Sequence, residues 1–221
     1  MNCESAEQIV RQIADVEIDD KISFVIKKTE EIMEESEYQG VRLSLDAYLD
    51  KTRIPLKIDI STGDVITPCE ISFSYQLMFE NRTIPLLAYP PETVLAEKLE
   101  TILSRGEANT RLRDFYDVYI LQREDFVVTP DALRYALLAT CRKRGHEDLL
   151  HTYASILDRV RQSDTMRTQW MKYQSDFDYA AGITWDTVLD TVETLCMKTL
   201  DDHAFGDELP QEESQFEMHL L

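Results

Sequence analysis

The sequence predicts an α+β fold, with a sheet in the first half of the chain and helices in the second. Residues 40–49 and 53–61 each alternate apolar and polar side chains, which is typical of strands with one buried face. From Pro130 onward, apolar residues recur at helical spacing almost throughout. Strands that precede helices in this way favour an α+β architecture over the regular alternation of a parallel α/β fold.

Length and composition are those of a soluble globular chain. Its 221 residues are enough to bury a sizeable core, and its 43% hydrophobic and 29% charged content lies in the ordinary range. A formal net charge of -19 disfavours sequence-independent binding to nucleic acid or anionic lipid. It still permits a local basic groove, a cleft that holds polyanions through metal ions, or a basic partner protein.

Several features favour a cytoplasmic protein without a membrane partner. No apolar run approaches the roughly 18 residues that span a bilayer, and the N-terminus lacks a basic-then-apolar signal pattern. The four cysteines are scattered, with no C-x-x-C pair, which favours reduced thiols over disulfides or a zinc site.

The first third of the chain predicts one helix followed by strands. Residues 4–16 place apolar side chains at helical spacing behind Ser5, which predicts a helix capped by that serine. The run KISFVIKKTEEIME predicts a strand that passes into a charged loop or helix.

The two alternating runs, joined by a short polar turn, predict an antiparallel hairpin with one buried face. Since successive side chains of a strand point to opposite faces, Lys57 and Asp59 point away from the aliphatic layer. Pro55 places the second strand at an edge of the sheet or near its own start.

A helical hairpin is predicted over residues 89–121. Pro90 and Pro91 start its first helix, because proline suits the first helical turn, and Gly106 ends that helix. The second helix runs from about Arg111. Further helices are predicted over residues 131–145, 149–162, 165–176 and 184–200, followed by an acidic tail.

Charged residues are concentrated in this hairpin, and each has two interpretations. Lys98 lies at the edge of the apolar face, either as a surface lysine with a buried stem or as a phosphate-binding ammonium. Asp114 and Asp117 share one helix face beside Arg113, where carboxylates also suit a helix start. Asp59 is either a half-exposed strand residue or a metal ligand, since strand carboxylates hold the cations of phosphoryl-transfer sites.

Two stretches, RIPLKIDISTGDVITP and LLAYPPETVLAEKLETILSRGEANTRLRDFYDVYIL, resemble the AbiEii/AbiGii family of nucleotidyltransferase toxins. These are the toxin half of bacterial abortive-infection toxin–antitoxin systems, which act in phage defence. The resemblance covers about residues 15–122. It implies an incomplete nucleotidyltransferase-like mixed sheet with flanking helices in residues 1–125, a helical lobe in 126–205 and an acidic tail in 206–221.

The resemblance also implies chemistry and partners. Members of the family are understood to bind a nucleoside triphosphate with Mg²⁺ and to transfer its nucleotide part (NMP) to an acceptor, in some cases tRNA. A cognate antitoxin protein controls them.

The family's functional residues are expected at matching positions of this sequence. Lys98 matches the triphosphate lysine and Asp114 the essential late aspartate, so both are expected to be catalytic. Asp117, Arg105 and Arg113 are expected to contact the nucleotide with Lys98. The strand carboxylate Asp59 is expected to hold the metal.

One signature of the family, a Gly-Ser turn followed by Asp-x-Asp, does not occur in this sequence, and the pair Asp19 and Asp20 cannot replace it. We therefore expect a shortened form with impaired transfer or none. The alternatives are a non-catalytic binding or interaction module that retains the fold, and an acidic helical interaction protein. A sheet edge or apolar face left uncovered in a shortened form is expected to favour self-association into a homo-oligomer.

Overall fold

The computed structural model of the protein describes residues 2–18, 20–33, 39–123 and 128–200. The chain forms two compact units, residues 1–64 and 65–221. Strands dominate the first unit and helices the second, so the predicted α+β class is confirmed. No helix of the described residues is long and apolar enough to cross a membrane.

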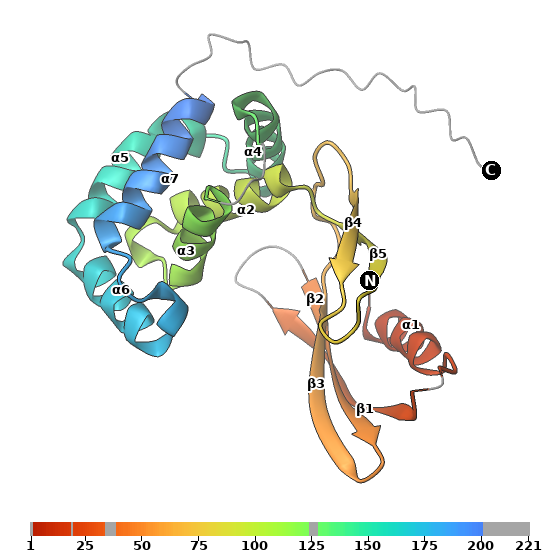
Figure 1. Ribbon diagram of the computed structural model, residues 1–221. Helices are drawn as coiled ribbons and strands as arrows, with labels where there is room; N and C mark the ends of the chain where they lie inside the picture. Colours follow the sequence, from red (N-terminus) through yellow and green to blue (C-terminus); the bar gives the residue numbers. More distant parts are fainter. Residues whose placement is uncertain (1, 19, 34–38, 124–127, 201–221) are drawn as a thin grey trace, which may run out of the picture. The chain divides into compact units, whose positions relative to one another are not determined.

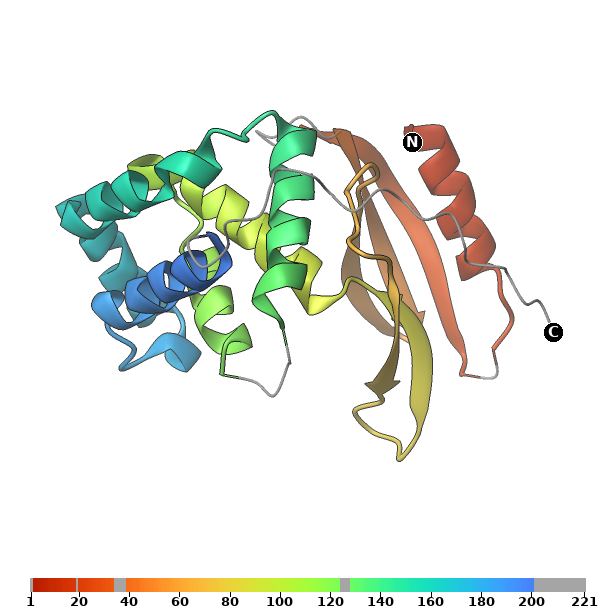
Figure 2. The same cartoon turned by 90° about the horizontal axis from the view of Figure 1, so that it is seen from above.

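The first unit is a three-stranded antiparallel sheet, in the order β1-β2-β3, with one helix on its face (Figures 1 and 2). Helix α1 is capped by Asn2, whose side chain accepts a hydrogen bond from the Ser5 backbone nitrogen at 2.8 Å. The predicted cap, Ser5, instead lies in the first turn and donates its hydroxyl to the same asparagine. The elements are α1 (Cys3–Ala14), β1 (Ile22–Met33), β2 (Gln39–Leu49) and β3 (Thr52–Ile60).

The predicted hairpin is confirmed by the pairing of β2 with β3, in which Leu45 lies opposite Leu56 and Leu43 opposite Ile58. Its apolar face is buried on β2 only. Leu43 and Leu45 lie beneath α1, whereas Leu56 and Ile58 on β3 are each 38% exposed. The difference arises because α1 packs on β1 and β2. Leu56 and Ile58 are thus partly exposed in this unit, and the expected uncovered face and self-association stay predictions.

The second unit opens with a two-stranded antiparallel hairpin, β4 (Ile71–Gln76) and β5 (Thr83–Ala88). Strand β4 was not predicted from the sequence. A mixed sheet was expected, with parallel and antiparallel pairs, but the described strands pair only in the antiparallel direction. Strands that follow one another through short connections pair in this way, whereas parallel strands need a crossover of a dozen or more residues.

The helical hairpin is confirmed, with α2 starting at Pro91 and Gly106 following it at a φ of 49°. A positive φ is readily adopted by glycine, which has no Cβ to clash with the backbone. The helices after it follow the predicted periodicity. The elements are α2 (Pro91–Arg105), η1 (Gly106–Ala108), α3 (Leu112–Leu121), α4 (Pro130–Arg144), α5 (Leu149–Gln162), α6 (Asp164–Asp176), η2 (Asp178–Ala180) and α7 (Trp185–Leu200).

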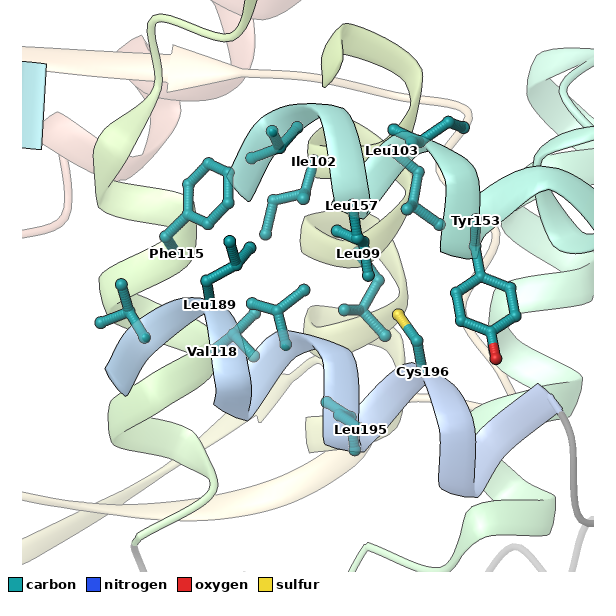
Figure 3. Packing of buried hydrophobic residues seen from close by; sticks show 14 of the residues in the cluster. Leu99, Ile102, Leu103, Phe115, Val118, Tyr153, Leu157, Leu189, Leu195 and Cys196 are labelled. Carbon is teal, nitrogen blue, oxygen red and sulfur yellow. The ribbon is translucent and has the colours of Figure 1, made fainter. Parts of the chain in front are cut away.

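One apolar core joins the helices of the second unit. Side chains of α2, α3, α5 and α7 meet in it, as Figure 3 shows for Leu99, Phe115, Leu157 and Leu189. The predicted domain boundary near residue 125 falls between α3 and α4, and both helices contribute to this core. Residue 125 itself lies outside the described ranges. The predicted acidic tail, 206–221, also lies outside them. This core fixes α2 and α3, the helices that carry the charged residues.

Candidate functional site

Lys98 lies at the centre of a charged cluster between α2 and α3. Its Nζ is 2.6 Å from Asp117 Oδ2 and 3.2 Å from Asp114 Oδ1, and it donates a hydrogen bond to each. The two aspartates meet one ammonium because residues three apart lie on the same face of a helix. The cluster therefore follows from the three-residue spacing of the aspartates on α3 and from the position of Lys98 on α2.

Arginines complete the neutralisation of these carboxylates. Arg111 Nε lies 3.2 Å from Asp114 Oδ2, and Arg113 Nε lies 3.7 Å from Asp117 Oδ2. The Asp114 side chain is only 6% exposed, so burial of its charge depends on these cations. Among the described residues its Oδ2 receives no hydrogen bond, and the contact with Arg111 is an ion pair alone.

A short turn places Arg111 at the start of α3. Asn109 is fully buried, and its Oδ1 accepts a hydrogen bond from the Arg111 backbone nitrogen at 2.8 Å. An asparagine that bonds the backbone two residues on fixes a turn of this kind. The turn after Gly106 thereby sets the distance between Lys98 and α3.

The charged cluster opens into a pocket of about 650 Å³, which we call the Lys98 pocket. Four cations and three carboxylates line it, so its side chains carry a positive balance in a chain with a net charge of -19. A positive balance of this kind suits an anionic ligand. The lining residues are Lys98, Thr110, Arg111, Leu112, Arg113, Asp114 and Asp117 from α2, α3 and their turn, and Gln169, Lys172, Tyr173, Asp176 and Phe177 from α6 and its end.

Aromatic rings form the α6 side of the Lys98 pocket. The ring centroids of Tyr173 and Phe177 are 4.7 Å apart, and Phe177 stacks on Tyr179 at 5.4 Å. The Tyr173 hydroxyl lies 3.0 Å from that of Tyr179, and burial raises the pKa of Tyr173 above its usual range. Tyr173 is therefore held as a neutral phenol and adds no negative charge to the pocket.

Two predicted site residues, Asp59 and Arg105, are not among those that line the Lys98 pocket. Asp59 is on β3, in the other unit, where Arg42 donates two hydrogen bonds of 2.7 Å to its carboxylate. These bonds hold the pKa of Asp59 below its ordinary value. Arg105 is half-buried in the last turn of α2 and is not among the residues that line the Lys98 pocket.

In the described part of the chain, the predicted site aspartates are paired with cations and are not grouped as metal ligands. Within the part of the chain that the structure describes, no group of three or more His, Cys, Asp or Glu side chains is placed to hold a metal ion. Asp114 and Asp117 are bridged by the Lys98 ammonium, and Asp59 is engaged by Arg42. The metal role of Asp59 therefore stays a prediction.

Comparison with known families matches residues 4–191 to the family described as nucleotidyl transferase AbiEii toxin of a type IV toxin–antitoxin (TA) system. The chain belongs to the AbiEii family. No curated protein and no solved structure matches it. The predicted family is thus confirmed, and the match extends beyond the 15–122 of the sequence resemblance. Membership makes this chain a nucleotidyltransferase-like toxin, for which a nucleotide, a divalent metal ion and an antitoxin are implied in general terms.

Sequence reasoning missed the wall of the Lys98 pocket that α6 supplies. Gln169, Lys172, Tyr173 and Asp176 follow at helical spacing on one side of α6, next to the face that carries buried Met166 and Trp170. Tyr173 lies at the border of the two faces, where its ring stacks on Trp170 at 5.3 Å. That stripe of polar and aromatic residues is visible in QWMKYQSD, but its position beside α3 depends on tertiary packing. Arg111 was also missed, although it immediately precedes the helix that carries Asp114.

Proposed function

We propose that the Lys98 pocket binds the triphosphate of a nucleoside triphosphate. The observation that carries this proposal is the position of Lys98, whose ammonium faces an open, positively balanced pocket and is held there by two carboxylates. In the complete reaction the nucleotide part (NMP) would pass to an acceptor such as the end of a tRNA.

The charge distribution supports this assignment. Arg111, Arg113 and Lys172 line the same pocket as Lys98, and guanidinium and ammonium groups are the usual partners of phosphate. Lys98 is 20% exposed at its side chain, so a triphosphate reaches it without unfolding either helix. Its bonds to Asp114 and Asp117 restrict the ammonium to the pocket, which reduces the entropy lost when a ligand binds.

The proposal extends to the individual residues. Lys98 contacts the phosphates, Arg113 and Arg105 supply auxiliary positive charge, and Asp114 and Asp117 hold the lysine in place. Mg²⁺ is expected to arrive bound to the triphosphate, since this ion retains waters and usually uses only one or two carboxylates.

Transfer by residues 1–221 alone is expected to be impaired, because this sequence lacks the Gly-Ser…Asp-x-Asp motif. The alternative, a non-catalytic module that retains the fold, predicts nucleotide binding without transfer under every condition. A cognate antitoxin, an action in the cytoplasm and a role in phage defence belong to the same proposal.

Equilibrium binding tests the proposal. Titration of ATP, GTP, CTP and UTP, each with Mg²⁺, is expected to show saturable binding of at least one nucleotide, measured by calorimetry. Lys98→Met keeps the aliphatic stem and removes the charge, and it is expected to weaken that binding by about 10- to 100-fold, which corresponds to one lost charge-assisted contact.

The matched control is Lys198→Ala, which removes one exposed lysine of α7 outside the Lys98 pocket. It lowers the net charge equally and is expected to change affinity by less than about two-fold. Circular dichroism must show that Lys98→Met is folded, because Asp114 loses a partner in it. Equal affinities of the folded Lys98→Met variant and the wild type would refute the proposal.

A further inference from the structure

The α6 wall of the Lys98 pocket contains a buried acceptor without a partner. The Oε1 atom of Gln169 is buried and receives no hydrogen bond within the described residues, although Gln169 lines the pocket. An unpaired buried amide oxygen costs free energy, which a ligand bearing an N–H group would recover. This acceptor therefore points to a ligand that donates a hydrogen bond.

The same wall offers an aromatic surface. Phe177 follows the last residue of α6 and is 42% exposed, and its ring packs against the rings of Tyr173 and Tyr179. Exposed rings that line a pocket beside cationic groups are typical of sites where a base stacks, since every nucleobase has a π-face. The aromatic surface lies at the C-terminal end of α6, and Gln169 lies about two helical turns earlier on the same helix.

Most of the cations of the Lys98 pocket come from other elements than the candidate base-binding groups, and only Lys172 shares α6 with Gln169. Lys98, Arg111 and Arg113 come from α2, α3 and their turn, whereas Gln169 and Phe177 come from α6 and its end. A ligand with an anionic part and a flat, N–H-bearing part would contact both walls at once.

We propose that Gln169 and Phe177 bind the nucleobase of the triphosphate, and that Gln169 Oε1 selects bases with an exocyclic amino group. This inference rests on the proposed function, because it assigns the base end of the same ligand. Phe177 stacks on the base, and Gln169 accepts a hydrogen bond from the amino group. Bases with an oxo group at that position place two acceptors against each other and bind less well.

Two matched ligand pairs test the selection. CTP and UTP differ by an amino or an oxo group on the ring and by an acceptor or an N–H donor at the neighbouring ring nitrogen, and ATP and inosine triphosphate differ in the same way. Wild-type protein is expected to bind the amino member of at least one pair about 5- to 10-fold more tightly, as one satisfied buried acceptor implies. Gln169→Met has a similar volume and no amide oxygen, and it is expected to reduce that preference to less than about two-fold.

Phe177→Leu provides a second variant that is expected to fold, because the ring is partly exposed. It is expected to weaken the binding of all four nucleotides by about 5-fold or more, in line with the loss of one stacked ring. Inorganic tripolyphosphate is the base-free probe. Both α6 variants are expected to bind tripolyphosphate as the wild type does.

The outcomes separate this inference from the proposed function. If tripolyphosphate and nucleotides bind through Lys98, yet the amino preference is missing or survives in Gln169→Met, the base assignment is wrong and the triphosphate assignment stands. If Phe177→Leu leaves nucleotide affinity unchanged, the stacking role is likewise overturned. If neither tripolyphosphate nor any nucleotide binds, both proposals fail.

Discussion

Replacement of Arg144 should destabilise the second unit more than replacement of its partner, Glu100. The Glu100 side chain is 2% exposed, and its two oxygens contact Arg144 at the end of α4 and His146 Nδ1, the latter at 2.6 Å. Arg144 is 18% exposed and His146 46%. The carboxylate depends on its partners for solvation, whereas its partners retain access to water.

The magnitudes follow from this asymmetry. Arg144→Ala leaves a buried carboxylate with His146 as its remaining partner among these three residues, and breaking a buried pair in this way costs about 3–5 kcal/mol. Glu100→Gln keeps the side-chain volume and leaves two groups that water can reach, so we expect about 1.5–3 kcal/mol. The double variant should lose less than the sum of both, because residues in one network do not act additively.

Tryptophan fluorescence during urea or thermal unfolding reports the stability of the second unit, because both tryptophans of the chain, Trp170 and Trp185, lie in its helical core. Arg144→Ala is expected to lower the Tm by about 6–20 °C for a chain of this size. Arg159→Ala is the control, because its pair with Glu107 is more than half exposed and should contribute less than about 1 kcal/mol. The reasoning is refuted if Glu100→Gln is the more damaging change or if the two changes add fully.

Two further predictions concern titratable groups. Burial raises the pKa of the Cys141 thiol to about 12, so Ellman's reagent at pH 8 is expected to label exposed Cys69 quickly and Cys141 only after denaturation; peptide mapping that finds equal labelling of both would contradict this. The hydrogen bonds from Arg42 lower the pKa of Asp59 in the folded state, so this pair stabilises the first unit above the ordinary pKa of 3.8 and ceases to do so as pH falls through the lowered value. Hydrogen exchange of the β2–β3 hairpin is accordingly expected to be faster in Asp59→Asn than in wild type at pH 6, and this difference is expected to shrink as the pH falls below 3.8. A difference that is the same at pH 6 and at the lowest pH at which the protein stays folded would rule out this linkage.

Local patterns predicted the parts of the fold that depend on neighbours in the chain. Period-two alternation was sufficient to predict that β2 and β3 form a hairpin, and the prolines and Gly106 marked the limits of α2. The cap of α1 was assigned to Ser5 because serine is a common cap, but Asn2 occupies the position from which a side chain reaches the Ser5 nitrogen. Strand β4 lies after a Gly/Pro-marked segment, and its alternation in ISFSYQ is short.

Only the wall of the candidate site that α2 and α3 form was predicted from the sequence. The spacing of Lys98, Asp114 and Asp117 was visible in the sequence, and the structure brings these three together. Gln169 and Phe177 are more than 50 residues further along the chain, and no local pattern states which helix α6 will pack against. Asp59 lies in a separate compact unit, so the geometry of the Lys98 pocket provides no test of its role.

The tight turn at Gly106–Asn109 has a consequence for how the cluster assembles. Lys98 and Asp117 are 19 positions apart, so bringing them together requires closure of a short segment and little loss of chain entropy. Contacts that are this local form on the timescale of helix pairing, ahead of long-range docking by α7. The arrangement of acids around the lysine therefore depends on one contiguous segment, residues 98–117, and needs no distant part of the chain to bring its charges together.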